Sequence, residues 1–309
     1  MPIAILTILV IFAALLTWVE RRLLGLWQDR YGPDRVGPFG VLQVVADMIK
    51  ILFKEDWVPP FADRAAYVLA PAVAMAAPLL AFAAIPIAPG IGIGGLDGIG
   101  LLFGLAMMAL SVYGTVLAGW ASADKYALLG GLRAAAQMLS YEVFMGLSVM
   151  GVAMQAGSFD LGAIVLAQRG LWYVVPQFLG FVLFTIAGTA AIHRLPFDLP
   201  EAESELVAGF HTEYASLKFG MFFLGEYVGI ILVAALMVTL FLGGWLGPLL
   251  LPPPVWFLAK LAIVIAFFIL LRAALPRPRY DQMMAFGWKL MLPLALVNLM
   301  VTGAVLLGA

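Results

Sequence analysis

Residues 99–120 read IGLLFGLAMMALSVYGTVLAGW and contain no charged side chain over 22 positions. A helix needs about 20 apolar residues to cross the hydrocarbon core of a bilayer. Similar stretches lie at roughly residues 2–19, 67–87, 139–154, 172–192, 219–242, 255–271 and 290–307. The sequence therefore predicts an all-α integral membrane protein, with about eight transmembrane helices in a single domain of 309 residues.

The composition supports this class. The chain is 64% hydrophobic and 11% charged, whereas about a quarter of the residues in a soluble domain are charged. A formal net charge of −1 does not favour nucleic acid binding. Because the chain has no cysteine, it lacks ligands for an iron–sulfur cluster. We expect no flavin, cluster or metal on this chain, so any redox cofactor belongs to a partner.

The distribution of basic residues predicts the orientation. Of 17 Lys and Arg, 15 lie in the loops after the first, third, fifth and seventh predicted helices, together with 14 of the 18 acids. The positive-inside rule makes this side cytoplasmic and both termini periplasmic. Residues 2–19 have no basic head and no cleavage site, so they are expected to span the membrane rather than to form a signal peptide. A face rich in both signs favours docking of a soluble partner.

Residues 39–54 are predicted to form an amphipathic helix at the membrane interface. Asp47 and Lys50 recur at helical spacing with Gln43 and Lys54, and apolar residues fill the other faces. A surface anchor would explain the lysines. It would not explain Asp47, since an acid gains nothing from anionic lipid.

Two acids, Glu142 and Glu226, fall inside predicted transmembrane helices. A carboxylate at bilayer depth costs several kcal/mol unless it is paired, hydrated or neutralised, and such residues often serve transport or proton relay. The alternative is that both lie near the cytoplasmic helix ends and reach the interface.

The loop over 193–218 is unusually acidic. Asp198 and Glu201 fit a helix N-cap with its capping box, which leaves three further acids without a local role. Close carboxylates raise one another's pKa values and share protons. His193 and His211 lack metal-ligand spacing. The acids of this loop are Asp198, Glu201, Glu203, Glu205 and Glu213. Basic residues flank them at the ends of the first and seventh predicted helices: Arg21, Arg22, Arg272, Arg277 and Arg279.

Several motifs, in order over essentially the whole chain, resemble those of one family. The first are ERRLLG at 20–25, RYGPDRVGP at 30–38, LQVVADMIK at 42–50 and FKED at 53–56. They continue with GWASADKYALLG at 119–130, SYE at 140–142, PFDLPEAE at 196–203, HTEY at 211–214 and RYDQ at 279–282. Together they resemble the H subunit of bacterial respiratory complex I. Its mitochondrial counterpart is subunit 1 of that complex.

The resemblance implies a membrane subunit of a proton-translocating NADH:quinone oxidoreductase in the bacterial inner membrane. Such a subunit forms much of the chamber by which quinone, the substrate, enters from the bilayer. The implied partners are peripheral-arm subunits, which carry the flavin and iron–sulfur clusters, and small neighbouring membrane subunits. Quinone reduction would then be coupled to proton translocation.

The resemblance also assigns expected roles to single residues. The quinone chamber would be lined or braced by Glu20, Arg21, Asp47 and Lys50. The acidic coupling loop would comprise Asp198, Glu201, Glu203, Glu205, Glu213 and Arg194. The intramembrane proton path would use Glu142 and Glu226, with Arg272 and Arg279 as counter-charges. Ala109 and Ala191 stand where some relatives have glutamates, which puts a continuous acidic path in doubt.

Other classes stay open at this point. The nearest is the homologous membrane component of an energy-converting hydrogenase or ferredoxin-linked complex, although the uninterrupted motifs favour the quinone-linked branch. A free-standing secondary transporter would show paired broken helices in two repeated halves, which this sequence lacks. An inert scaffold would leave Glu226 unexplained.

Overall fold

The computed structural model describes residues 2–92, 96, 98–248 and 251–308. The described chain is helical and contains no β-strand. Its longer helices are α1 (Pro2–Trp27), α2 (Gln43–Phe53), α3 (Arg64–Phe82), α4 (Gly100–Ala121), α5 (Lys125–Ala156), α7 (Phe178–Ala191), α9 (Ser216–Phe241), α10 (Pro253–Ala274) and α12 (Leu292–Gly308). The shorter elements are η1 (Pro38–Gly40), α6 (Leu161–Ala167), α8 (Glu203–Leu206), η2 (Gly209–His211), α11 (Tyr280–Phe286) and the π-helical turn η3 (Gly287–Met291).

Seven helices in the described chain are long and apolar enough to cross a membrane. They are α1, α3, α4, α5, α9, α10 and the continuous run from α11 to α12. The remaining predicted span is α7, an apolar helix of only 14 residues. At 1.5 Å per residue α7 covers roughly 21 Å. The first residues of the predicted span at 172–192 lie in the non-helical segment before α7. The all-α membrane fold is confirmed, with seven long spans and one short apolar helix.

The predicted fourth span was too short. The sequence placed it at 139–154, whereas α5 runs for 32 residues from Lys125. Lys125, Arg133 and Gln137 lower the hydropathy of the first half without lowering its helix propensity. Asp124 starts the helix by accepting from the amides of Tyr126 and Ala127. The helix therefore extends well beyond the stretch that its hydropathy marks.

Three loop acids cap helices. The carboxylates of Asp63, Asp124 and Asp160 accept backbone N–H groups at the starts of α3, α5 and α6. Each satisfies two amides that have no partner within the helix. Part of the acidic charge between the spans therefore fixes helix starts.

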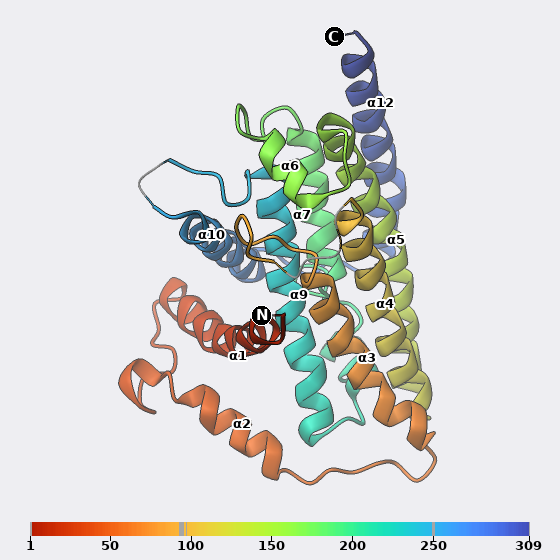
Figure 1. The fold of residues 1–309 in the computed structure, drawn as a ribbon. Helices are drawn as coiled ribbons and strands as arrows, with labels where there is room; N and C mark the ends of the chain where they lie inside the picture. The colour runs from red at the N-terminus through yellow and green to blue at the C-terminus, as the bar shows by residue number, and fades with distance from the viewer. Residues whose placement is uncertain (1, 93–95, 97, 249–250, 309) are drawn as a thin grey trace.

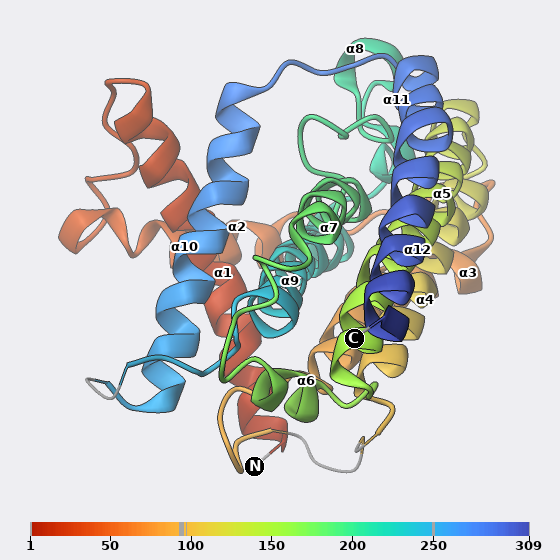
Figure 2. The same cartoon turned by 90° about the horizontal axis from the view of Figure 1, so that it is seen from above.

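The central helix is α9, which lies between α1, α2 and α10 on one side and α3, α5 and α7 on the other (Figures 1 and 2). Every residue from Ile230 to Phe241 is buried. A second group packs α3 against α4 and α4 against α5, and α12 lies along α5 and α7. Burial of its whole second half makes α9 the rigid axis of the molecule.

Helix α2 stands apart from the bundle (Figure 1), and none of its residues is buried. Its polar attachments are few. Arg21 of α1 contacts Asp47 at 2.7 Å, Ser216 Oγ donates to Ile51 O at 3.0 Å, and the Lys218 ammonium contacts Asp56 just beyond the helix at 2.7 Å. Leu42, Val45, Ile49 and Leu52 stay exposed along it. The predicted amphipathic helix is present and its apolar face is not covered by the described part of this chain.

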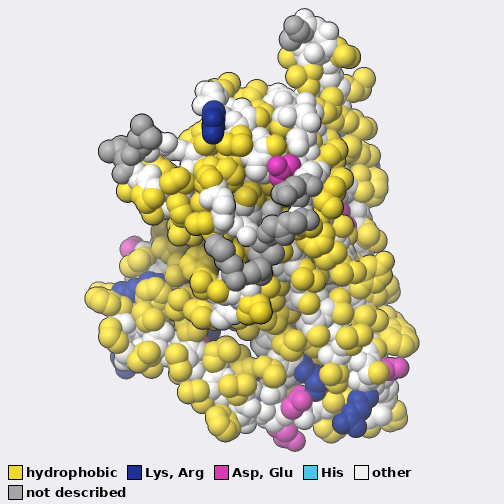
Figure 3. All heavy atoms as spheres, viewed as in Figure 1, with side chains coloured by type: hydrophobic (Ala, Val, Ile, Leu, Met, Phe, Trp, Pro, Cys, Tyr) yellow, Lys and Arg dark blue, Asp and Glu magenta, His cyan; other side chains and the backbone are white. Residues whose placement is uncertain are grey.

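The outer surface is mainly hydrophobic. In Figure 3 hydrophobic side chains cover most of the visible face, and Lys, Arg, Asp and Glu gather mainly towards its lower edge and left side. In the same orientation this is the end where α2 lies and α3 and α9 begin (Figure 1). The surface fits a protein that lies in a bilayer with charge concentrated at one end.

Candidate functional site

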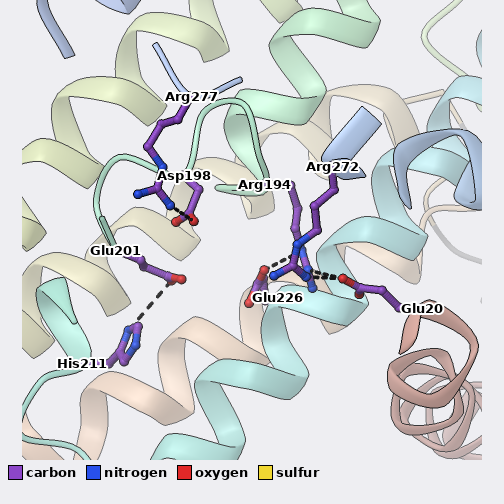
Figure 4. Close-up of polar contacts among 8 residues, drawn as sticks. All are labelled: Glu20, Arg194, Asp198, Glu201, His211, Glu226, Arg272 and Arg277. Carbon is purple, nitrogen blue, oxygen red and sulfur yellow. Dashed lines mark hydrogen bonds and ion pairs between the residues drawn. The ribbon is translucent and has the colours of Figure 1, made fainter. Parts of the chain in front are cut away.

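Four charged side chains from distant parts of the sequence meet inside the bundle. Arg194 Nη1 donates to Glu20 Oε1 at 3.0 Å, and Arg194 Nε lies 2.6 Å from Glu226 Oε1. Arg272 also donates to Glu20 Oε1 (Figure 4). We call Glu20, Arg194, Glu226 and Arg272 the buried ion network. It ties together α1, the loop after α7, α9 and α10.

Burial is greatest at the centre of the network, whereas Arg272 at its edge keeps 38% of its side chain exposed. Glu20 is 3% exposed and Arg194 is 7% exposed. Burial alone would lower the pKa of Arg194, but the carboxylates of Glu226 and Glu20 raise it above its ordinary value. Arg194 therefore remains charged at every physiological pH. Two guanidinium groups balance two carboxylates, which is how charges survive at this depth.

The loop that carries Arg194 is held in place from α5. The buried Gln137 amide donates from Nε2 to Ala190 O and to Phe197 O, both at 2.8 Å. Arg194 lies between these two carbonyls in sequence. Its guanidinium carbon stands 4.6 Å from the centre of the Tyr227 ring on α9. One amide thus closes the loop at both ends and aims the guanidinium at α9.

Two further acids, Asp198 and Glu201, lie beside the buried ion network, each next to a basic side chain. Asp198 accepts from Arg277 Nη2 at 2.8 Å, and Glu201 Oε1 lies 3.8 Å from His211 Nδ1 (Figure 4). Burial, and then the carboxylates of Glu226 and Asp198, raise the pKa of Glu201 well above its usual range. Burial lowers the pKa of His211 to about 4. The Glu201 carboxyl therefore holds its proton more tightly than a free glutamate does, and the His211 imidazole is neutral at neutral pH.

One cavity of about 250 Å³ brings most of these groups together. Apolar side chains of α3, α4, α5 and α9 line part of its wall. The charged and titratable side chains on the wall are Glu142, His193, Arg194, Asp198, Glu201, His211, Glu226 and Arg272. Ala191 also lines it. Both predicted intramembrane acids therefore face the same space as two members of the acidic loop.

Three residues on the cavity wall carry a buried polar atom that has no hydrogen-bond partner in the described protein. The atoms are His193 Nε2, Asp198 Oδ1 and Glu142 Oε1, and each is inaccessible to solvent. Burial lowers the pKa of His193 to about 4, so its imidazole is neutral. Buried groups without partners are uncommon, so these three mark where the polar contacts of the wall are incomplete.

The other predicted residues lie outside this cavity. Arg21 Nη1 contacts Asp47 Oδ2 at 2.7 Å, and Gln43 supports Asp47 at 2.9 Å. Lys50 is exposed on the same helix. The predicted chamber set is therefore split: Glu20 belongs to the buried ion network, while Arg21, Asp47 and Lys50 lie at the α1–α2 surface.

The acidic loop is also divided. Glu205 pairs with Arg133 of α5 at a half-exposed position. Glu213 takes part through its carbonyl, which accepts from Tyr67 Oη at 2.7 Å. Glu203 begins α8, and its side chain lies outside the described part of the chain. Only Asp198 and Glu201 among the described acids of the loop line the cavity.

One expectation about local structure was wrong. Asp198 does not cap a helix, because α8 begins at Glu203 with Ala202 as its N-cap, and Asp198 binds Arg277 instead. Arg279 pairs with its neighbour Asp281 at 2.9 Å, with both side chains exposed. Within the described chain the counter-charge of Asp198 is thus Arg277, whose place after the seventh predicted helix was already visible in the sequence.

Sequence reasoning missed several contributors. Gln137 carried no signal, since a single amide in a long helix is unremarkable. His193 and His211 were considered only as metal ligands, and they reach the cavity as separate polar groups. Among the described residues, no group of three or more His, Cys, Asp or Glu could hold a metal ion.

The arrangement defines a polytopic membrane protein with a charged, protonatable cavity between its helices. Comparison with known proteins narrows this class. The NADH dehydrogenase family matches residues 1–303. The chain is 63% identical over 303 residues to the H subunit of the NADH-quinone oxidoreductase of Methylococcus capsulatus, covering 98% of this chain and 96% of the relative.

The chain therefore belongs to the NADH dehydrogenase family, as an H-type component of respiratory complex I. This confirms the resemblance found in the motifs. It places the protein in an oxidoreductase complex, with other complex I subunits as its partners, and it favours the quinone-linked branch over the hydrogenase alternative.

Proposed function

We propose that this protein forms much of a quinone-access chamber and couples quinone reduction to proton translocation. The observation that carries the proposal is the position of Arg194, which contacts Glu20 on α1 and Glu226 on α9 at once. A charge change on either carboxylate alters the balance of the whole network. The loop after α7 is therefore linked electrostatically to the centre of the membrane domain.

The chemistry requires protons as well as electrons. Reduction of a quinone to a quinol takes up two electrons and two protons, and the electrons come from partner subunits because this chain has no cysteine for a cluster. The raised pKa of Glu201 makes this carboxyl hold its proton more tightly than a free glutamate does. It faces the same cavity as Glu226 and Glu142, so proton release from Glu201 would change the charge next to both.

Quinone would approach along the α1–α2 surface. Helix α2 exposes an apolar stripe next to the Arg21–Asp47 pair, which combines a lipid-facing surface with fixed polar groups. Such a pair suits an apolar molecule with a polar head. Lys50 and Asp47 lie on the same helix three positions apart, so both reach one face.

The remaining roles follow from the surface. The charged end would dock the peripheral-arm subunits, and the exposed apolar faces of α5 and α12 would contact neighbouring membrane subunits or lipid. With the charged end on the cytoplasmic side of the bacterial inner membrane, both termini lie in the periplasm. Arg272 serves as counter-charge to Glu20, whereas the exposed Arg279 would meet a partner.

The test compares two activities of the purified complex. Glu226→Gln should lower NADH:quinone reductase activity by about tenfold or more, as expected for a residue in a coupled relay. NADH:ferricyanide reductase, which bypasses the chamber, should stay normal. Arg169→Gln, which removes an exposed charge at the opposite end of the membrane domain, should change neither activity. Equal loss of both activities in Glu226→Gln would indicate a role in assembly and reject the proposal.

A further inference from the structure

The opposite end of α9 contains a second buried charge that the proposed function does not use. Lys260 lies in α10, about two turns from its start at Pro253, and is 8% exposed. Its Nζ donates to Leu242 O at 2.7 Å, Gly244 O at 3.0 Å and Leu246 O at 2.6 Å. We call these three carbonyls the carbonyl cage. Three acceptors match the three hydrogens of an ammonium group, whereas a neutral amine has only two.

An aromatic ring completes the coordination. Lys260 Nζ lies 4.2 Å from the centre of the Trp172 indole, within the range of a cation–π contact. The turn that forms the cage fits around this ring. Gly243 and Gly244 both have positive φ, and a Cβ on Gly243 would meet Trp172 Nε1 at 2.8 Å. The backbone is therefore shaped to hold a cation at this point.

The neighbouring backbone groups are satisfied without solvent. The buried Gln168 donates to Ile164 O and Thr239 O, and its Oε1 accepts from Gly243 N at 2.9 Å and from Tyr173 N. Val174 N donates to Phe241 O at 2.9 Å. The ends of helices leave carbonyls that need partners from outside the helix. Here Lys260, Gln168 and the loop before α7 supply them.

The satisfied helix end affects where water can enter. Unpaired carbonyls at the end of a membrane helix recruit water, since each unsatisfied group in an apolar medium costs several kcal/mol. Glu226 lies on the same helix, so water at this end of α9 would extend a polar route from Glu226 towards the other face of the membrane. A fixed ammonium both replaces that water and repels hydronium ions, as fixed positive charges do in proton-excluding pores.

We propose that Lys260 is a tethered cation that fills the carbonyl cage and seals this end of α9 against water and protons. The seal lies on the far side of the membrane domain from the acidic loop. Protons gathered at the cavity would then leave through other subunits rather than directly along α9. Lys260 acts as a positioning and barrier residue, and it does not touch substrate.

The experiment measures passive proton leak, so it does not depend on the quinone chamber or on pumping. The complex is reconstituted into liposomes with a trapped pH dye, and an imposed pH gradient is followed without NADH. Lys260→Met keeps the length of the side chain and removes the charge. Arg169→Met is the matched control, because it removes an exposed cation near the same end. The melting temperature of Lys260→Ala is measured in detergent with and without methylammonium, which is small enough to occupy the cage.

We expect the gradient to decay several-fold faster with Lys260→Met than with the unmodified complex, while Arg169→Met leaves the decay unchanged. Methylammonium should raise the melting temperature of Lys260→Ala and leave that of the unmodified complex unchanged. Wild-type decay in Lys260→Met would overturn the proposal. If either variant assembles poorly, methylammonium present from cell lysis onward should restore assembly of Lys260→Ala. Failure of methylammonium to restore either property would show that the cage does not act as a cation site.

Discussion

Arg194 Nε lies 2.6 Å from Glu226 Oε1, so the loop after α7 is joined directly to the central helix α9. The same guanidinium binds Glu20 of α1. A lone carboxylate on α9 would be unstable in this position, and the Arg194 guanidinium provides its counter-charge. The loop, and not the helix packing alone, therefore controls the electrostatics of the membrane centre.

Removal of the Arg194 charge should destabilise the protein. Arg194→Met leaves Glu20 and Glu226 with Arg272 as their only counter-charge in the network, and loss of one partner from a buried ion pair costs about 3–5 kcal/mol. We expect a lower melting temperature of the purified complex and a reduced yield. Arg194→Lys should recover part of the yield, because one charge is restored without the forked geometry. A melting temperature of Arg194→Met equal to that of the unmodified complex would contradict the network.

Gln137 should act through the loop alone. Gln137→Met keeps the volume and removes the donor shared by Ala190 O and Phe197 O, and one unsatisfied buried group costs about 1–3 kcal/mol. We expect a smaller loss of thermal stability than for Arg194→Met, together with reduced quinone reductase activity. Gln155→Met is the control, since Gln155 lies on the same helix away from the loop. Similar effects of both substitutions would show that the amide matters only for the packing of α5.

Asp47 tests the surface half of the predicted chamber. Asp47→Asn removes the charge that binds Arg21, but the pair is solvent-exposed, so the loss in stability should stay below about 1 kcal/mol. We expect lower quinone reductase activity with normal ferricyanide reductase activity. The salt dependence of both is measured alongside. Failure of the complex to assemble would favour a role of α2 as an anchor.

The sequence predicted the spans from hydropathy and the polar surface from charge, and these agree with the structure apart from the short fourth span and the short helix α7. It could not predict which charges meet. Glu20 lies 174 positions from Arg194 and 252 positions from Arg272 along the chain, and only tertiary packing brings them together. The resemblance to the family named most of these residues, but it did not indicate that one guanidinium serves both carboxylates.

Local rules also failed where tertiary contacts were stronger. Asp198 and Glu201 have the spacing of a capping box, yet Arg277 offers Asp198 a charged partner, which is stronger than a backbone amide. Conversely, Asp63 and Asp124 look like surface charge and instead begin helices. Spacing alone therefore identifies the residue types at the site, while their partners depend on the fold.

The orientation can be tested independently of the site. Ala123 lies between α4 and α5, and Gly157 lies between α5 and α6, on opposite sides of a single span. Reporter fusions truncated after Ala123 and after Gly157 should report the cytoplasm and the periplasm, respectively. Phosphatase and fluorescent protein reporters provide opposite signals for each fusion. Equal signals from both positions would contradict the predicted topology.

The last prediction concerns how the acids of the loop are coupled. Glu201 shares the cavity with Glu226, which contributes to its raised pKa, whereas Glu205 binds Arg133 outside that cavity. Groups in one network show non-additive effects, and groups without shared partners are additive within about 0.5 kcal/mol. We therefore expect Glu201→Gln and Glu226→Gln to be non-additive in quinone reductase rate, and Glu201→Gln and Glu205→Gln to be additive.

The pKa of Glu201 determines how the stability of the protein changes with pH. Because the folded pKa of Glu201 is raised, the folded protein holds this proton more tightly than the unfolded chain does. Its contribution to stability is fully present below the unfolded pKa and is lost as pH rises towards the folded pKa. Glu201→Gln, which resembles the protonated acid, should therefore remove the transition that Glu201 causes as pH rises, both from the melting temperature and from the quinone reductase rate. The Glu205→Gln profile should keep that transition. An unchanged profile for Glu201→Gln, with strictly additive double variants, would show that these acids only hold the loop and its partners in place.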